Sequence, residues 1–141
     1  MSRFMLFVMH DAAAEQSGPP PVEMVELVEK MNAFNEEMLR AGVLLAADGL
    51  MPASAGARVR FDGGERPSVV DGPFAEAKEV VGGYWIIQAR TQEEAVEWAS
   101  RAPLPGGTIE IRKIGEPEDY PDEVAEASGL TREPPEQTVE R

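Results

Sequence analysis

The segment from Arg3 to Met9 constrains the fold more than any other part of this 141-residue chain. It is an almost unbroken apolar run that ends at His10 and Asp11, which is typical of a strand covered on both faces. Because neighbouring side chains of a strand point to opposite sides of a sheet, such a run presents apolar groups to both sides. A sheet built on this strand therefore needs a second layer on each face.

The rest of the pattern supplies two helices and further strands. Residues 22–41 place apolar side chains at helical spacing, and Gly42 then stops the helix. Thr91 with Glu94 forms a capping box for a second helix, which Pro103 ends. Strands are predicted over residues 43–50, 57–62, 67–71, 83–90 and 108–114, with a glycine pair joining the two short ones as a hairpin.

This order of elements predicts an α+β fold, namely the ferredoxin-like split βαβ arrangement with an inserted β-hairpin. The two helices can cover only one face of its sheet. Residues 83–90 repeat the two-sided apolar pattern of the first strand, so the second face is apolar too, and such faces usually mark interfaces. We expect two copies of the chain to bury these faces as a homodimer. The alternative is that the hairpin folds over the face within one chain.

Charge limits the partners of the chain and divides it into two parts. A net charge of −13 repels phosphate backbones, so direct binding to nucleic acid is not expected. Nine acidic residues, two arginines and four prolines lie between residues 115 and 141. We therefore predict a domain over residues 1–115 and an acidic, largely disordered tail over residues 116–141. The first apolar run is too short for a signal peptide or a membrane span, which predicts a cytoplasmic protein that does not bind membranes.

Metal and cofactor chemistry has little support in the composition. The chain lacks cysteine and has one histidine, His10, which excludes disulfides and nearly every zinc, copper or iron–sulfur site. Neither a Walker loop nor a dinucleotide glycine fingerprint occurs, so no cofactor is expected. His10 at a strand end suggests a haem ligand or a general base, and a merely exposed side chain is the simpler interpretation.

Residues 70–79, which read VDGPFAEAKE, resemble the signature of the DGPF group of YCII-related proteins. Further agreement occurs at residues 34–37, 41–45, 48–52, 82–87 and 94–99, so the resemblance covers residues 3–120. It implies a dimeric α+β barrel of ferredoxin-like subunits. Most members of the group have no assigned activity, and a fold alone does not define a function.

The resemblance also bears on mechanism. Some YCII-like relatives are treated as enzymes with a proposed His–Asp dyad on the first helix. Met31 and Arg40 stand at those positions here and cannot supply it. Members of the DGPF group also resemble proteins encoded beside extracytoplasmic-function sigma factors, which implies a non-catalytic regulatory or accessory role as the alternative.

Charged side chains in the signature are candidate functional groups. Asp71 precedes a Gly-Pro pair, where it could cap a short helix or act as a catalytic carboxylate. Glu76 and Glu79 would share one face of that helix and act as acid and base or hold Mg²⁺, with Lys78 as their salt-bridge partner. Solvated surface charge is the plainer alternative. Phe74 is expected to anchor the segment in the core.

Polar and aromatic residues outside the signature could complete a pocket. Asn35 lies beside the apolar stripe of the first helix, next to Glu36, and would line a cleft or sit at the helix edge. Asp48 would be a general base if it projects into an apolar barrel. Tyr84 and Trp85 face opposite ways, and the one that faces the barrel could stack on an aromatic substrate or pack in the core.

The leading prediction is a homodimer that binds a small organic molecule between the first helix, the sheet and residues 71–79. If the protein is an enzyme, we expect cofactor-free proton-transfer or lyase chemistry. A non-catalytic regulator that uses the acidic tail to bind a partner is the alternative, and a haem or oxygen-using barrel enzyme is suggested only by similarity of architecture. The catalytic candidates are Asp48, Asp71 and Glu76, and the binding candidates are Asn35, Glu36, Phe74, Lys78, Glu79, Tyr84 and Trp85.

Overall fold

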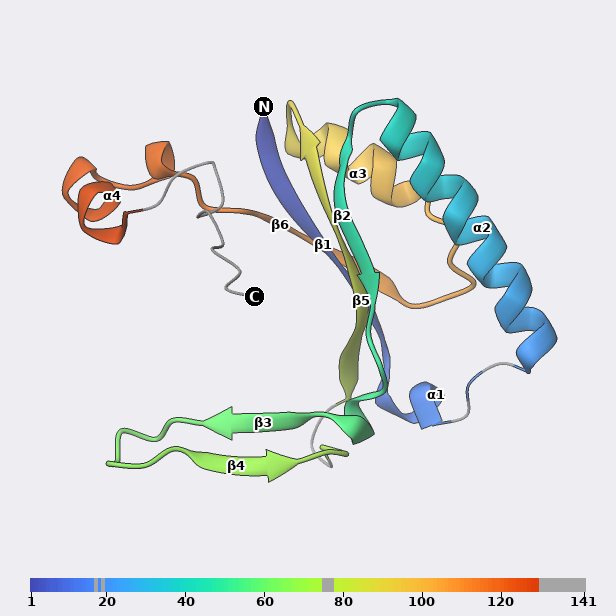
Figure 1. The fold of residues 1–141 in the computed structure, drawn as a ribbon, viewed down its shortest axis with the longest axis horizontal. Coiled ribbons are helices and arrows are strands. Elements are labelled where there is room, and N and C mark those ends of the chain that lie inside the picture. The colour runs from blue at the N-terminus through green and yellow to red at the C-terminus, as the bar shows by residue number, and fades with distance from the viewer. Residues whose placement is uncertain (17, 19, 75–77, 130–141) are drawn as a thin grey trace, which may run out of the picture.

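The computed structural model of the chain describes residues 1–16, 18, 20–74 and 78–129. A four-stranded antiparallel sheet has the order β2-β5-β1-β6, and β3 pairs with β4 in a separate hairpin (Figure 1). This is the strand order of the split βαβ arrangement, so the predicted fold class is confirmed. The strands are β1 (Ser2–Asp11), β2 (Leu44–Gly49), β3 (Ala57–Arg60), β4 (Ser68–Asp71), β5 (Glu79–Ala89) and β6 (Thr108–Lys113).

Two helices, α2 (Pro21–Arg40) and α3 (Gln92–Ser100), lie on one face of the sheet (Figure 1). Proline suits the first turn of α2 because its missing N–H would have no partner there, and Gly42, with φ of 71°, follows the end of the helix. The Thr91 side chain accepts a hydrogen bond of 3.1 Å from the Glu94 amide, which confirms the predicted cap. The opposite face of the sheet carries no described helix packed against it.

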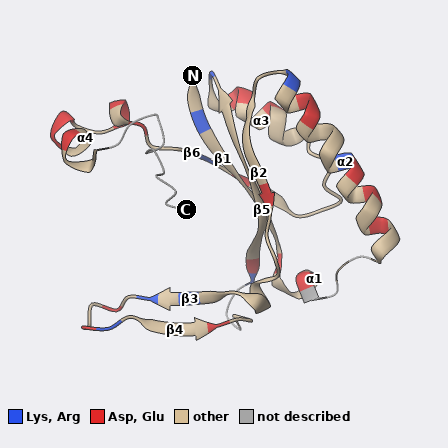
Figure 2. Ribbon diagram, in the orientation of Figure 1, with Lys and Arg blue, Asp and Glu red and all other residues tan. Residues whose placement is uncertain are grey.

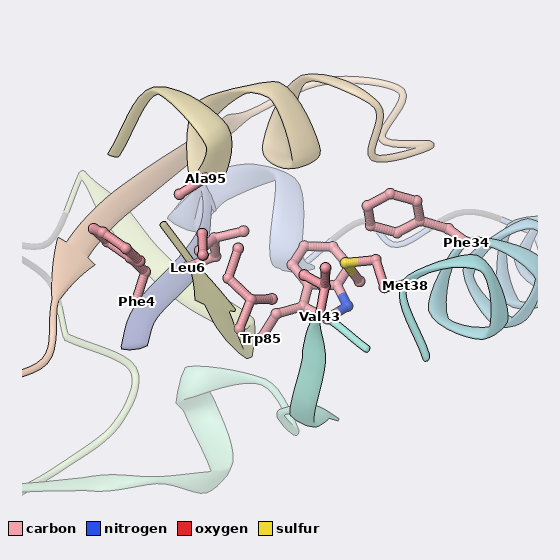
Figure 3. Close-up of a cluster of buried hydrophobic side chains, with 9 residues drawn as sticks. Phe4, Leu6, Phe34, Met38, Val43, Trp85 and Ala95 are labelled. Carbon is pink, nitrogen blue, oxygen red and sulfur yellow. The ribbon is translucent and has the colours of Figure 1, made fainter. Parts of the chain in front are cut away.

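The core lies between this sheet and the two helices. Phe4 and Leu6 of β1 and Trp85 of β5 point into it, as the strand alternation predicted (Figure 3). Ile87 of β5 is buried in the same cluster. The buried apolar stripe of α2 is shorter than predicted, because Val28, in the first half of the helix, is 52% exposed. The second half of the helix supplies the buried residues Phe34 and Met38.

Four shorter elements complete the described chain: α1 (Ala12–Gln16), η1 (Ala53–Ala55), η2 (Pro117–Asp119) and α4 (Asp122–Ser128). Glu116 is buried, and its carboxylate pairs with the Arg3 guanidinium at 2.6 Å, which ties the start of the tail to β1. Figure 2 shows the acidic residues of α4, which stands apart from the sheet. The disorder expected over residues 116–141 stays a prediction, and residues 130–141 lie outside the described residues.

Two expectations about the signature are wrong. The short helix expected directly after Asp71 does not form in the described residues of this segment: Pro73, Phe74 and Lys78 are not helical, and β5 begins at Glu79, four residues earlier than predicted. Phe74 does not reach the core, since its ring lies under the Arg58 guanidinium at 3.9 Å, on the hairpin. Glu76 falls within residues 75–77, which lie outside the described residues.

Candidate ligand-binding site

A cavity of about 270 Å³ lies between α2 and the sheet. Val8, Met31 and Ala47 give it apolar walls, which come from β1, α2 and β2. On the side of the sheet it is lined by Gly49, Gly82 and Gly83. Gly49 leaves free space here, since no atom lies within 4 Å of its Cβ position, whereas the His10 ring fills that space at Gly82. The cavity therefore depends on the residues of the sheet as well as on those of α2.

Asn35 gives the cavity a fixed polar group. Its Oδ1 accepts a hydrogen bond of 2.8 Å from the indole Nε1 of Trp85, and both residues line the cavity. Since the indole is a donor only, this bond fixes the amide with its oxygen toward Trp85 and its Nδ2 group turned away. Asn35 is thus held in place with two N–H groups for a ligand, beside a second amide side chain, Asn32.

Tyr84 and Asp48 form a pair on the opposite face of the sheet. Both residues border the cavity, but strand alternation sends the Tyr84 side chain to the face that Trp85 does not occupy. The Tyr84 hydroxyl donates to Asp48 Oδ2 at 2.7 Å. This hydrogen bond, with smaller contributions from burial and from the carboxylate charge, raises the pKa of Tyr84.

Replacing Asp48 with asparagine should lower the pKa of Tyr84, because the neutral amide no longer disfavours the phenolate. The ultraviolet absorbance of the phenolate reports this during a pH titration. A Tyr120→Phe background leaves Tyr84 as the remaining tyrosine of the chain. An unchanged titration in Asp48→Asn would show that the pair does not form in solution.

His10 is joined to Glu15, a residue that the sequence did not single out. The ring Nε2 lies 2.7 Å from Glu15 Oε2, and the other carboxylate oxygen accepts from the Ala53 amide. The hydrogen bond with His10 contributes most to lowering the pKa of Glu15, and burial opposes it. The interpretation of His10 as merely exposed is wrong, since its side chain is 33% exposed and paired.

The signature lies against the same Ala53. Gly72 donates its amide to the Gly56 carbonyl at 2.9 Å, and a Cβ atom on Gly72 would stand 2.0 Å from the carbonyl oxygen of Ala53. Glycine is therefore required here by a close approach of two backbone segments. Asp71, exposed at the end of β4, pairs in register with Ala57, and it borders no part of the cavity.

The remaining candidates lie on the surface. Glu36 is exposed and forms an i, i+4 ion pair of 3.4 Å with Arg40. Lys78 and Glu79 are exposed at the start of β5, where Glu79 pairs in register with Asp11. Of the ten residues predicted for the site, four border the cavity. Asn35 and Trp85 meet on its helix side, and Tyr84 and Asp48 pair on the opposite face of the sheet.

The sequence of this chain is similar to those of known proteins. A family model described as the YCII-related domain matches residues 3–117. An uncharacterised protein of Rhizobium meliloti (strain 1021) is 33% identical over 91 residues, which cover 62% of this chain and 73% of that protein. No helix among the described residues is long and apolar enough to cross a membrane.

Proposed function

The chain belongs to the YCII-related family, and we propose that it is a homodimer that binds a small organic molecule in the cavity between α2 and the sheet. The cavity is the observation that carries this proposal. Its walls are mainly apolar and include the indole of Trp85, while the Asn35 amide offers a fixed polar contact. Pockets of this kind suit small ligands with an apolar body and one or two polar groups.

Dimerisation is supported by the uncovered face of the sheet. Met5 and Phe7 of β1 and Ile86 of β5 point to this face, since their neighbours in each strand point into the core. These apolar side chains are half-buried, and no described helix packs over them. A second copy placed sheet to sheet would remove them from water and would enclose the Tyr84–Asp48 pair between the subunits.

Proton-transfer or lyase chemistry remains part of the proposal. Of the predicted carboxylates, Asp48 is at the border of the cavity, with its side chain paired to Tyr84 on the other face of the sheet, and Asp71 lies on the hairpin. Binding alone would also account for the cavity, so the first experiment measures binding.

Ligand binding should move the indole N–H signal of Trp85 in a proton–nitrogen NMR spectrum, because this group is hydrogen-bonded in the wall of the cavity. The chain has two tryptophans, and Trp98 provides an internal control, since its ring lies beside Arg101 and does not line the cavity. A Trp98→Phe variant assigns the two signals. Small aromatic and aliphatic fragments are added in turn. If no fragment moves the Trp85 signal, the binding proposal fails.

Replacing Ile86 with aspartate should weaken the dimer by at least roughly tenfold, because a charge would be buried at the centre of the sheet-to-sheet contact. Light scattering and sedimentation over a range of concentrations measure the change. Val59→Asp on the exposed hairpin is the matched control and should leave association unchanged. A wild-type protein that stays monomeric at micromolar concentration would refute the dimer.

A further inference from the structure

We propose that the cavity binds a flat, uncharged aromatic molecule with a hydrogen-bond acceptor, such as a carbonyl oxygen, and that Asn35 is the residue that selects the acceptor. The inference rests on the proposed binding function and adds a ligand class to it. It is carried by the orientation of the Asn35 amide, by the shape of the cavity wall on the sheet and by the negative charge around the cavity.

The Asn35 amide can offer only hydrogen-bond donors to a ligand. Its Oδ1 accepts from the Trp85 indole at 2.8 Å, and within the described residues Nδ2 has no hydrogen-bond acceptor. Rotating the amide would place two N–H donors against each other, because the indole nitrogen cannot accept. Trp85 therefore fixes the amide, and a ligand that brings an acceptor to Nδ2 gains a hydrogen bond there. A ligand that brings a donor would leave both donors unpaired, which is unfavourable in an apolar cavity.

The cavity wall on the sheet is flat where β2 forms it. Ala47 and Gly49 are alternate residues of β2, so they face the same side, and they pair in register with Trp85 and Gly83 of β5. Ala47 contributes a single methyl group, and Gly49 contributes no side chain. A flat ring can lie against such a wall, and the thioether of Met31 on the facing helix makes favourable contacts with aromatic rings. At about 270 Å³ the cavity is at the small end of ligand pockets, which favours a small ring compound.

The charges near the cavity disfavour an ionised ligand. Asp48 is at its border, with its carboxylate hydrogen-bonded to Tyr84 on the other face of the sheet. The whole chain carries a net charge of −13, and the described lining residues include no lysine, arginine or histidine. A carboxylate ligand would therefore lose its hydration in a negative environment without a countercharge. An ammonium ligand would meet the N–H groups of Asn35, which repel it. A neutral acceptor avoids both costs.

A set of ligands of similar shape tests the class: acetophenone, benzoate and isopropylbenzene. Acetophenone is neutral and has an acceptor, benzoate has a carboxylate in place of the acetyl group, and isopropylbenzene has no acceptor. The Trp85 indole N–H signal in a proton–nitrogen NMR spectrum measures the binding of each ligand. We expect acetophenone to bind more tightly than benzoate by at least roughly tenfold, because the ionised carboxylate must be desolvated.

Asn35→Asp tests the residue. The carboxylate keeps an acceptor for Trp85 Nε1 and removes the N–H groups, so an indole signal that stays protected from solvent exchange shows an intact wall. We expect the affinity for acetophenone to fall by roughly tenfold and that for isopropylbenzene by less than about threefold, since only the former loses a hydrogen bond. Ala33→Asp is the matched control. It adds the same charge at an exposed site of α2 that does not line the cavity, and it should leave both affinities unchanged.

The outcomes separate the ligand class from binding itself. Benzoate that binds as tightly as acetophenone would overturn the neutral class, and equal losses for acetophenone and isopropylbenzene in Asn35→Asp would overturn the role of Asn35. Ligand binding stands in both cases. If aliphatic fragments move the Trp85 signal and none of the aromatic ligands does, the aromatic class is wrong. Failure of every fragment to move the signal removes the binding function and the inference together.

Discussion

Replacing Trp85 with alanine should lower the free energy of unfolding by about 3–5 kcal/mol. The indole is 3% exposed and meets the Phe34 ring edge to face, with the centroids 5.6 Å apart and the planes at 85° (Figure 3). It joins β5 to α2 through this contact and through its hydrogen bond to Asn35. Truncation would leave a large void beneath α2, which the surrounding structure can close only in part. Urea denaturation followed by circular dichroism measures the loss.

Trp85→Phe is the matched variant, because it keeps an aromatic ring in the core and removes the indole N–H. It should cost less than alanine, with about 1 kcal/mol assigned to the lost hydrogen bond to Asn35. Trp98→Phe, at a half-buried site on α3, gives the cost of the same substitution outside the cavity wall. If alanine and phenylalanine at position 85 prove equally stable, the packing of α2 on the sheet does not depend on this residue.

The core of the fold could be predicted from the sequence because burial and strand alternation act together. If the run from Arg3 to Met9 forms a strand, the alternation of side chains places Phe4 and Leu6 on the same face of the sheet. The same rule places Tyr84 and Trp85 on opposite faces. Helix caps such as Thr91 are also local, since the donor lies three residues away. Patterns within a short window were therefore sufficient for these elements.

The contacts that build the site are not local. Glu15 reaches both His10 and Ala53, and Gly72 packs against the same Ala53, so segments distant in the sequence meet at one backbone turn. No periodicity marks Glu15, which lies in a short polar helix between a strand and a proline-rich loop. The signature around Asp71 predicts the start of a helix, because an acidic residue before a Gly-Pro pair is a typical local signal for one. In the structure Gly72 instead approaches the backbone of Ala53, and the described residues Pro73 and Phe74 are not helical.

Replacing Gly72 with alanine should release the hairpin from the body of the protein. The new Cβ would overlap the backbone carbonyl of Ala53, which cannot move aside as a flexible side chain would. All eight residues of β3 and β4 are exposed, so the hairpin has little core of its own, and a two-stranded sheet is marginal in isolation. Hydrogen exchange at the β3–β4 amides should accelerate by roughly tenfold to a hundredfold, which corresponds to about 1–3 kcal/mol.

Gly106→Ala is the control for this substitution. Gly106 has no atom within 4 Å of its Cβ position, so alanine should be accommodated there with little change in exchange. The amides of β1 and β5 should stay protected in Gly72→Ala, because the four-stranded sheet does not depend on the hairpin for its core. Uniform loss of protection across both sheets would instead mean that the signature glycine supports the whole domain. Unchanged exchange in the hairpin would mean that the contact between Gly72 and Ala53 does not hold it in place.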